Sequence, residues 1–122
     1  MSENVGIVRN EQNMQKALSI ILEIKKEYKN IGVGGNLQYN PGLLQCLELH
    51  SMLEISELLV RGAIMRKESR GAHYRSDFPK KDKNWLKNIV FRKDDGKVES
   101  YTFSPPEMPP YLKEILPEEK YE

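Results

Sequence analysis

Apolar residues recur at helical spacing in the first part of the chain. Steps of three or four residues separate a set that would share one helix face, namely Met14, Leu18, Ile21, Ile24 and Tyr28. This pattern predicts a helix over residues 11–29. Asn10 is a suitable N-cap, because its side chain can accept a hydrogen bond from the first turn. Glycine tolerates the positive φ that ends a helix, so we expect a loop at Gly32, Gly34 and Gly35.

A second, longer helix is predicted from about residue 42 to about residue 67. Asn40-Pro41 favours its start, since a proline in the first turn leaves no N–H unsatisfied. Its apolar positions are numerous: Leu43, Leu44, Leu47, Leu53, Ile55, Leu58, Leu59 and Ile64. Such a broad apolar face is wide enough to contact two neighbours.

Two helices of unequal length cannot bury that face alone, so the pattern calls for a third helical element. We interpret Val5 to Val8 as the end of such a helix. The predicted fold class is mainly α: a three-helix, spectrin-repeat-like bundle over residues 1–90, with a β-hairpin and an extended tail over residues 91–122.

The region after Gly71 has turn and strand signals instead of helical periodicity. Asp77-Phe78-Pro79 predicts an extended turn, and residues 85–91 read as an extended segment or strand. Asp94-Asp95-Gly96 favours a hairpin whose return strand contains Val98, Tyr101 and Phe103. The proline-rich stretch 104–110 is incompatible with helix or sheet interior, and an acidic tail follows it.

Charge is unevenly distributed although the net charge of the 122 residues is only +1. Residues 1–60 carry 5 basic and 7 acidic groups (−2), residues 61–97 carry 12 and 5 (+7), and residues 98–122 carry 2 and 6 (−4). The single cysteine excludes an internal disulfide. No apolar run is long enough to cross a bilayer, and the N-terminus does not resemble a signal peptide. These features predict a cytoplasmic protein without a membrane span.

The stretch from Arg66 to Pro79 is the densest in polar chemistry. Its arginines are forked donors within reach of Glu68 and Asp77, and Gly71 occupies a position that favours positive φ. A cationic cluster just beyond a long helix is suited to docking on another surface. We therefore predict a domain or subunit interface at Arg66, Glu68, Ser69, Arg70, Gly71, His73, Arg75 and Asp77.

This stretch also resembles the C-terminal signature of succinate dehydrogenase and fumarate reductase flavoprotein subunits. Matching positions are Arg66, the run Glu68 to His73, Arg75, Asp77-Phe78-Pro79 and Trp85-Leu86. The resemblance covers about residues 4–105. Lys80-Lys81-Asp82-Lys83 departs from the family's usual arginine and paired aspartates, so L-aspartate oxidase and adenylylsulfate reductase stay open as alternative subfamilies.

The resemblance implies that this chain is a C-terminal helical fragment of such a flavoprotein. The parent would oxidise succinate to fumarate with FAD and pass electrons to an iron–sulfur subunit. Its flavin-binding and catalytic residues would lie upstream, so we expect no catalytic, cofactor-binding or metal-binding residue here. The fragment would brace the flavin domain and the subunit interface, with the parent complex peripheral on the inner face of the membrane.

Four other readings have less support from the residues. His73 with Asp77 or Tyr74 could form an acid–base pair, but neither a second nearby histidine nor paired carboxylates accompany it. Cys46, His50 and His73 give three metal ligands where a structural zinc needs four. Gly32, Gly34 and Gly35 follow a predicted helix where a phosphate loop would follow a strand. The basic stretch contains interleaved aromatics, as nucleic-acid platforms do, but no nucleic-acid motif, so we predict no nucleic-acid partner.

Overall fold

The computed structural model describes residues 1–95 and 97–115. The chain divides into two compact units, Met1–Lys80 and Lys81–Glu122. The domain boundary expected between residues 90 and 91 stays a prediction.

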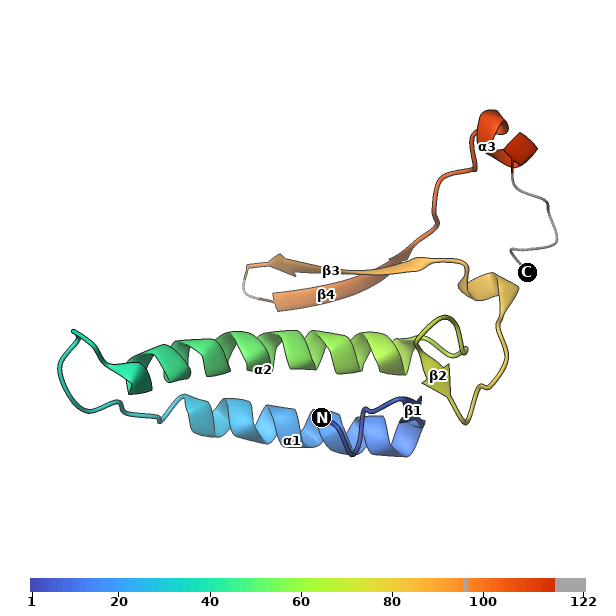
Figure 1. The fold of residues 1–122 in the computed structure, drawn as a ribbon. Helices are drawn as coiled ribbons and strands as arrows, with labels where there is room; N and C mark the ends of the chain where they lie inside the picture. Colours follow the sequence, from blue (N-terminus) through green and yellow to red (C-terminus); the bar gives the residue numbers. More distant parts are fainter. Residues whose placement is uncertain (96, 116–122) are drawn as a thin grey trace. The chain divides into compact units, whose positions relative to one another are not determined.

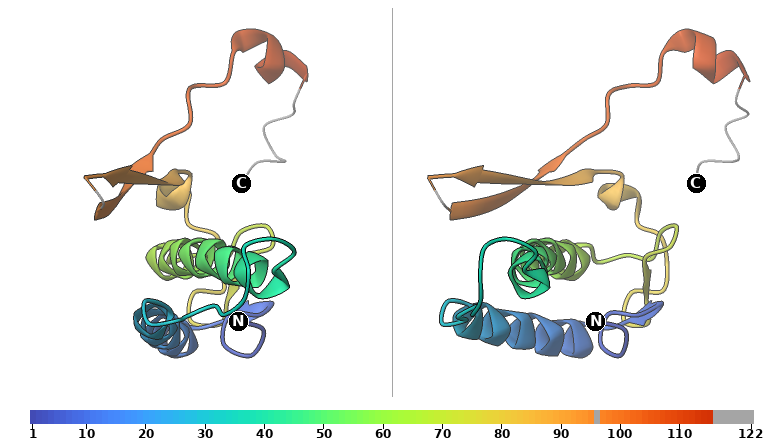
Figure 2. Two further views of the ribbon diagram at one scale, coloured as in Figure 1. Left: turned by 90° about the vertical axis from the view of Figure 1, so that its left-hand side faces the viewer. Right: turned by 60° about the vertical axis from the view of Figure 1, so that its left-hand side comes forward.

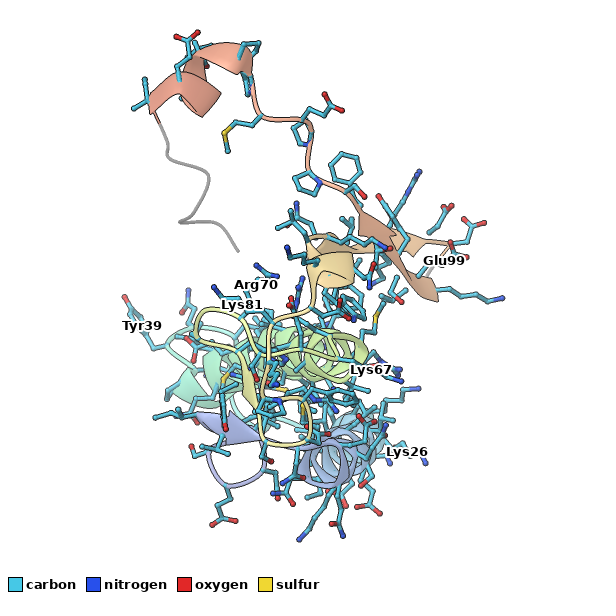
Figure 3. All side chains as sticks on the ribbon, turned by 90° about the vertical axis from the view of Figure 1, so that its right-hand side faces the viewer. Lys26, Tyr39, Lys67, Arg70, Lys81 and Glu99 are labelled. Atoms are coloured by element: carbon cyan, nitrogen blue, oxygen red, sulfur yellow. The ribbon has the colours of Figure 1, made fainter. Side chains whose placement is uncertain are left out.

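The first unit is built on an antiparallel pair of helices, α1 (Glu11–Tyr28) and α2 (Pro41–Met65). They lie side by side in each view of the ribbon (Figures 1 and 2). Both predicted helix starts are confirmed: the Asn10 side chain accepts from the Asn13 N–H at 2.8 Å, and the Asn40 side chain accepts from the Leu43 N–H at 3.0 Å. Residues 29–40 form the predicted loop between the helices, in which Tyr39 is fully exposed and points outward (Figure 3).

The buried core of this unit lies along the seam between the two helices. Met14, Ala17 and Ile21 of α1 pack with the corresponding face of α2, and Val5 closes one end. The members contributed by α2 are Leu53, Val60 and Ala63. Lys25 and Glu57 join the helices by an ion pair of 2.7 Å. The seam covers one face of each helix only.

The predicted third helix at Val5 to Val8 is wrong. Val8–Arg9 is a short strand, β1, which pairs in parallel with β2 (Tyr74–Arg75). Before β1 the chain forms a turn, closed by the Val5 N–H, which donates to the Met1 carbonyl at 2.8 Å. The turn requires glycine at position 6, because a Cβ there would lie only 2.7 Å from the Ser2 carbonyl oxygen. The first unit is therefore a helix pair with a two-stranded parallel contact, and the three-helix bundle is not confirmed.

The second unit contains the predicted hairpin, formed by β3 (Asn88–Asp94) and antiparallel β4 (Lys97–Phe103). The strand begins later than residue 85, because Lys83–Trp85 forms a 3₁₀ turn (η1) that the Asp82 side chain caps at the Asn84 N–H. After the irregular stretch 104–109, a short helix that the sequence did not predict, α3 (Pro110–Ile115), begins at a proline, which suits a first helical position. The rest of the acidic tail, residues 116–122, lies outside the described residues.

Candidate functional site

The stretch predicted as an interface folds into a tight turn beyond the end of α2. Arg70 and His73 exchange backbone hydrogen bonds of 2.8 and 3.0 Å, with Gly71 between them at a φ of 58°. Glycine is favoured there because an L side chain is strained at positive φ. Gly71 thus shapes this turn, whereas α2 itself ends earlier, at Met65.

Ser69 fixes the return path of the chain. Its hydroxyl oxygen accepts from the Arg75 N–H at 2.8 Å, and the hydroxyl donates to the Phe78 carbonyl at 2.8 Å. The turn therefore brings Arg75 back under the end of α2, although it lies nine residues beyond the helix cap.

Arg75 is fully buried and joins both helices. Its guanidinium donates to both carboxylate oxygens of Asp77, at 2.9 and 2.6 Å, and to Glu11 at 2.6 Å. The same Asp77 carboxylate accepts from the Glu11 backbone N–H at 3.0 Å. A bidentate arginine–carboxylate pair is both strong and directional. Together these bonds attach the turn to the first residue of α1.

The remaining nitrogen of Arg75 caps α2. Its Nη1 donates to the carbonyl oxygens of Ala63, Ile64 and Arg66 at 3.3, 2.9 and 3.2 Å. The last carbonyls of a helix have no partner within it and bear partial negative charge, so a guanidinium satisfies them by bonding and by charge. The Phe78 ring covers the guanidinium at 4.7 Å.

Glu68 is the second fully buried charged side chain, and it bonds within the same turn. It accepts from Arg66 at 2.7 Å and from Arg70 at 2.8 Å. A buried carboxylate is tolerable only when it is paired and hydrogen-bonded, and two guanidinium partners meet that requirement.

His73 connects the turn to β1. Its Nδ1 lies 3.0 Å from Nη1 of Arg9, and its Nε2 lies 3.3 Å from the Arg66 carbonyl oxygen. Burial lowers the pKa of His73 most, and the positive charges of Arg9, Arg75 and Arg66 lower it further, against the opposing effect of the bond to the carbonyl. His73 is thus neutral at pH 7.

Charge pairing also shifts the pKa of each member of the Arg75 group. The hydrogen bonds from Arg75 lower the pKa of Asp77 from 3.8 to about 2. The bonds from Gln15 and then from Arg75 lower the pKa of Glu11. The bond to Asp77 raises the pKa of Arg75. All three groups are charged at neutral pH, and each charge has an opposite partner.

This arrangement is built for internal attachment. Every buried side-chain nitrogen and oxygen of the described residues has a hydrogen-bond partner. One ring nitrogen of His73 bonds to Arg9 and the other to the Arg66 carbonyl. Neither is therefore directed at Asp77 or Tyr74, as an acid–base pair would require. The docking role assigned to the stretch stays a prediction, but Glu68 and Arg75 bond inward, within the first unit.

The alternative metal ligands are not gathered in space. Cys46 donates to the Tyr28 hydroxyl at 3.6 Å and His50 stacks on the Tyr28 ring, both near the start of α2, whereas His73 lies beyond its end. Among residues 1–95 and 97–115, no group of three or more His, Cys, Asp and Glu side chains could hold a metal ion. No helix in that part of the chain has the length and apolarity to cross a bilayer.

The glycine loop does not fit a dinucleotide cofactor such as FAD. It follows α1, whereas a dinucleotide cradle needs a strand before the glycines and a helix whose first N–H groups face the phosphates. Here Asn40 already bonds the first turn of α2 and also donates to the Gly34 and Asn36 carbonyls at 3.0 Å.

Two partners of the site, Arg9 and Glu11, were missed by sequence reasoning. Glu11 lies 64 residues from Arg75, and Arg9 lies 64 residues from His73. Each looked like an ordinary exposed charge near a helix start. No local pattern could have identified them, because only the parallel pairing of β1 with β2 brings them to the turn.

Known proteins are similar to this chain in sequence and in fold. Residues 1–120 match the family described as fumarate reductase flavoprotein C-term. The chain is 40% identical over 92 residues to an uncharacterized FAD-dependent oxidoreductase of Methanocaldococcus jannaschii and 40% identical over 99 residues to the fumarate reductase flavoprotein subunit of Haemophilus influenzae. These alignments cover 75% and 79% of this chain but 16% of each relative, so the chain spans about a sixth of their length.

Solved structures of the same kind of protein have a similar fold in this region. A chain of Mycobacterium smegmatis Sdh1 superposes with a TM-score of 0.84 at 33% identity, covering 93% of this chain and 20% of that one. The FrdA chain of Escherichia coli quinol fumarate reductase gives 0.80 at 31% identity, covering 90% and 20%. In both, the fold described above is one part of a much longer polypeptide.

Proposed function

The chain belongs to the family of fumarate reductase flavoprotein C-terminal domains, and from this we propose that it braces a flavin-binding domain without carrying out chemistry itself. It is the C-terminal domain of a succinate dehydrogenase or fumarate reductase flavoprotein subunit. The inward-bonded charges of the first unit support a structural role, since each buried side-chain nitrogen and oxygen of the described residues bonds within the chain.

The proposed parent is an FAD-dependent oxidoreductase that interconverts succinate and fumarate. Relatives named fumarate reductase and succinate dehydrogenase flavoprotein subunit support this choice over L-aspartate oxidase or adenylylsulfate reductase. By the same analogy the parent passes electrons to or from an iron–sulfur subunit, in a complex peripheral to the inner face of the membrane. FAD would bind to the part of the polypeptide that this chain lacks.

The observation that carries the bracing role is a row of exposed apolar side chains on α2. We call this row the α2 stripe; it consists of Leu44, Leu47, Met52, Ile55 and Leu59, which are 58%, 59%, 62%, 64% and 46% exposed. Spacings of three, five, three and four residues keep them near one side of the helix, apart from the buried Leu53 and Val60 that contact α1.

Exposure of this kind is costly in a protein that works alone. Large apolar side chains contribute about 1.5–3 kcal/mol each when fully buried, so covering the α2 stripe would supply several kcal/mol to an interface. Contiguous exposed apolar patches on soluble proteins mark interaction sites. In the relatives, the matched region is 16% of the polypeptide, and the rest is about five times as long. We propose that this remaining part covers the α2 stripe.

Co-purification tests the proposal. The chain is co-expressed with the flavin-binding part of a related flavoprotein subunit, such as that of Haemophilus influenzae fumarate reductase. Gel filtration is monitored at the flavin absorption near 450 nm. We expect the two to co-elute, and Ile55→Glu in the α2 stripe to abolish co-elution, because it places a carboxylate in an apolar contact.

A matched control separates the stripe from general surface effects. Ile24 is a 38% exposed isoleucine on α1, so Ile24→Glu makes the same chemical change on the other helix. We expect Ile24→Glu to co-elute normally, and both variants to keep the helical circular dichroism of the parent chain. Co-elution of Ile55→Glu at wild-type yield would contradict the bracing role of the stripe.

A further inference from the structure

His73 lies where three elements meet, and each contributes an arginine. These are Arg9 of β1, Arg66 at the end of α2 and Arg75 of β2, and their positive charges oppose protonation of the His73 ring. The nearby carboxylates are already committed: Glu68 accepts from Arg66 and Arg70, and Asp77 with Glu11 accepts from Arg75.

The partners of His73 determine which ring nitrogen carries its proton. A guanidinium can only donate, so Nδ1 must accept from Arg9 at 3.0 Å; a carbonyl can only accept, so Nε2–H must donate to Arg66 at 3.3 Å. This assigns the neutral, Nε2-protonated tautomer. A proton added to Nδ1 removes its lone pair and sets a positive ring against the Arg9 guanidinium.

β1 depends on this contact because it is only two residues long. Val8 also pairs with Tyr74 and Arg9 with Arg75, and the Ser76 N–H and hydroxyl donate to the Arg9 carbonyl at 2.8 and 3.2 Å. The Arg9 side chain has one further bond, from Nε to the Gly6 carbonyl at 2.9 Å. A strand of two residues has few hydrogen bonds to hold it in place when the protonated His73 ring repels the Arg9 guanidinium.

We propose that His73 is a pH-sensitive switch for β1: the neutral ring joins Arg9 to the end of α2, and protonation at Nδ1 releases Arg9 and detaches the strand. The switch concerns the first unit alone and does not depend on the bracing role.

The pH window follows from linkage. The folded state lowers the pKa of His73 below its usual 6.5, so the unfolded or detached state takes up the proton more readily. The attachment of β1 is complete above about pH 6.5 and weakens as the pH falls from there through the folded pKa. Each pH unit by which the folded pKa lies below 6.5 corresponds to about a tenfold increase in the detached population.

Nuclear magnetic resonance on the 122-residue protein tests the switch directly. Two-bond ¹⁵N–¹H spectra of the imidazoles at pH 7.5 should show His73 protonated on Nε2, and its titration midpoint should lie below 6.5. The hydrogen-exchange protection of the Ser76 amide, corrected for intrinsic exchange rates, should fall with the same midpoint. Asp77 titrates only near pH 2 and does not interfere in this range.

Two variants identify the group responsible. His73→Gln offers one acceptor and one donor without titrating, so it should keep Ser76 protected between pH 6.5 and 4.5. His50→Gln removes the other histidine of the chain, which is exposed on α2, and should leave the Ser76 profile unchanged.

Three results would overturn the switch: an Nδ1-protonated tautomer, a His73 midpoint at or above 6.5, or an acid-dependent loss of Ser76 protection that persists in His73→Gln. The first two are read from the unmodified protein, so a variant that folds poorly cannot leave the question open.

Discussion

Replacing Arg75 by methionine should cost the first unit a large part of its stability. The substitution keeps a long apolar stem and removes every guanidinium bond, to Asp77, to Glu11 and to the three carbonyls at the end of α2. The fall of the Asp77 pKa from 3.8 to about 2 sets an upper limit of ~2.5 kcal/mol on that pair, and solvent screening at the 29% exposed carboxylate reduces it to ~1–2 kcal/mol.

The carbonyls at the end of α2 add a comparable cost. Each net hydrogen bond contributes ~1 kcal/mol, and carbonyls left unpaired beside a buried methionine lose solvation as well. We therefore expect Arg75→Met to destabilise the unit by about 3–5 kcal/mol, the range for breaking a buried ion pair. A unit of this size is stable by about 4–12 kcal/mol in total, so the loss is a large fraction of its stability.

Urea denaturation followed by circular dichroism at 222 nm measures this loss at pH 7. Arg61→Met is the matched control, because Arg61 is a 43% exposed arginine of α2 whose pair with Glu57 spans one helical turn. Such surface pairs contribute ~0.3–0.5 kcal/mol. If the two variants lost the same small amount, below about 1 kcal/mol, Arg75 would not be the residue that joins the two helices.

Three further substitutions test other parts of the first unit. Asn10→Ala should cost ~1 kcal/mol in urea denaturation, because the Asn13 N–H loses its cap. Gly71→Ala should cost ~1 kcal/mol because of the backbone φ of 58°, although a Cβ there would meet no other atom. Gly34→Ala is the control: its surroundings are equally open and its φ is not positive, so it should be neutral or slightly stabilising in the same assay. Asp77→Asn should remove the stability that the wild type has above about pH 4 and loses as the pH falls through about 2, as thermal melts across that range would show.

The helices were predictable because their signals are local. Apolar spacing located α1 and α2 to within about two residues, and the side chains of Asn10 and Asn40 cap them as expected. The hairpin at residue 95 was predictable for the same reason: Asp95 has a φ of 44°, which the Asp-Asp-Gly sequence favours.

The errors arose where distant segments decide the outcome. Val5 to Val8 looked helical in isolation, but Val8 and Arg9 gain backbone partners from Tyr74 and Arg75, which sequence spacing cannot reveal. The interface predicted at the cationic turn stays a prediction. The burial of its Glu68 and Arg75 could not be predicted from spacing, because it depends on the turn folding back under α2 and on Glu11 of the other helix.

The separation between the internal charges and the α2 stripe has a consequence for how the domain is stabilised. A pair of helices buries one face of each, so the core is small, and the Arg75 bonds at one end compensate by attaching α1, α2 and β2 to one another. The other face of α2 takes no part in that compensation. Stability and docking should therefore be separable: Arg75→Met lowers the folded fraction while the folded molecules still dock, and Ile55→Glu stays folded but does not dock.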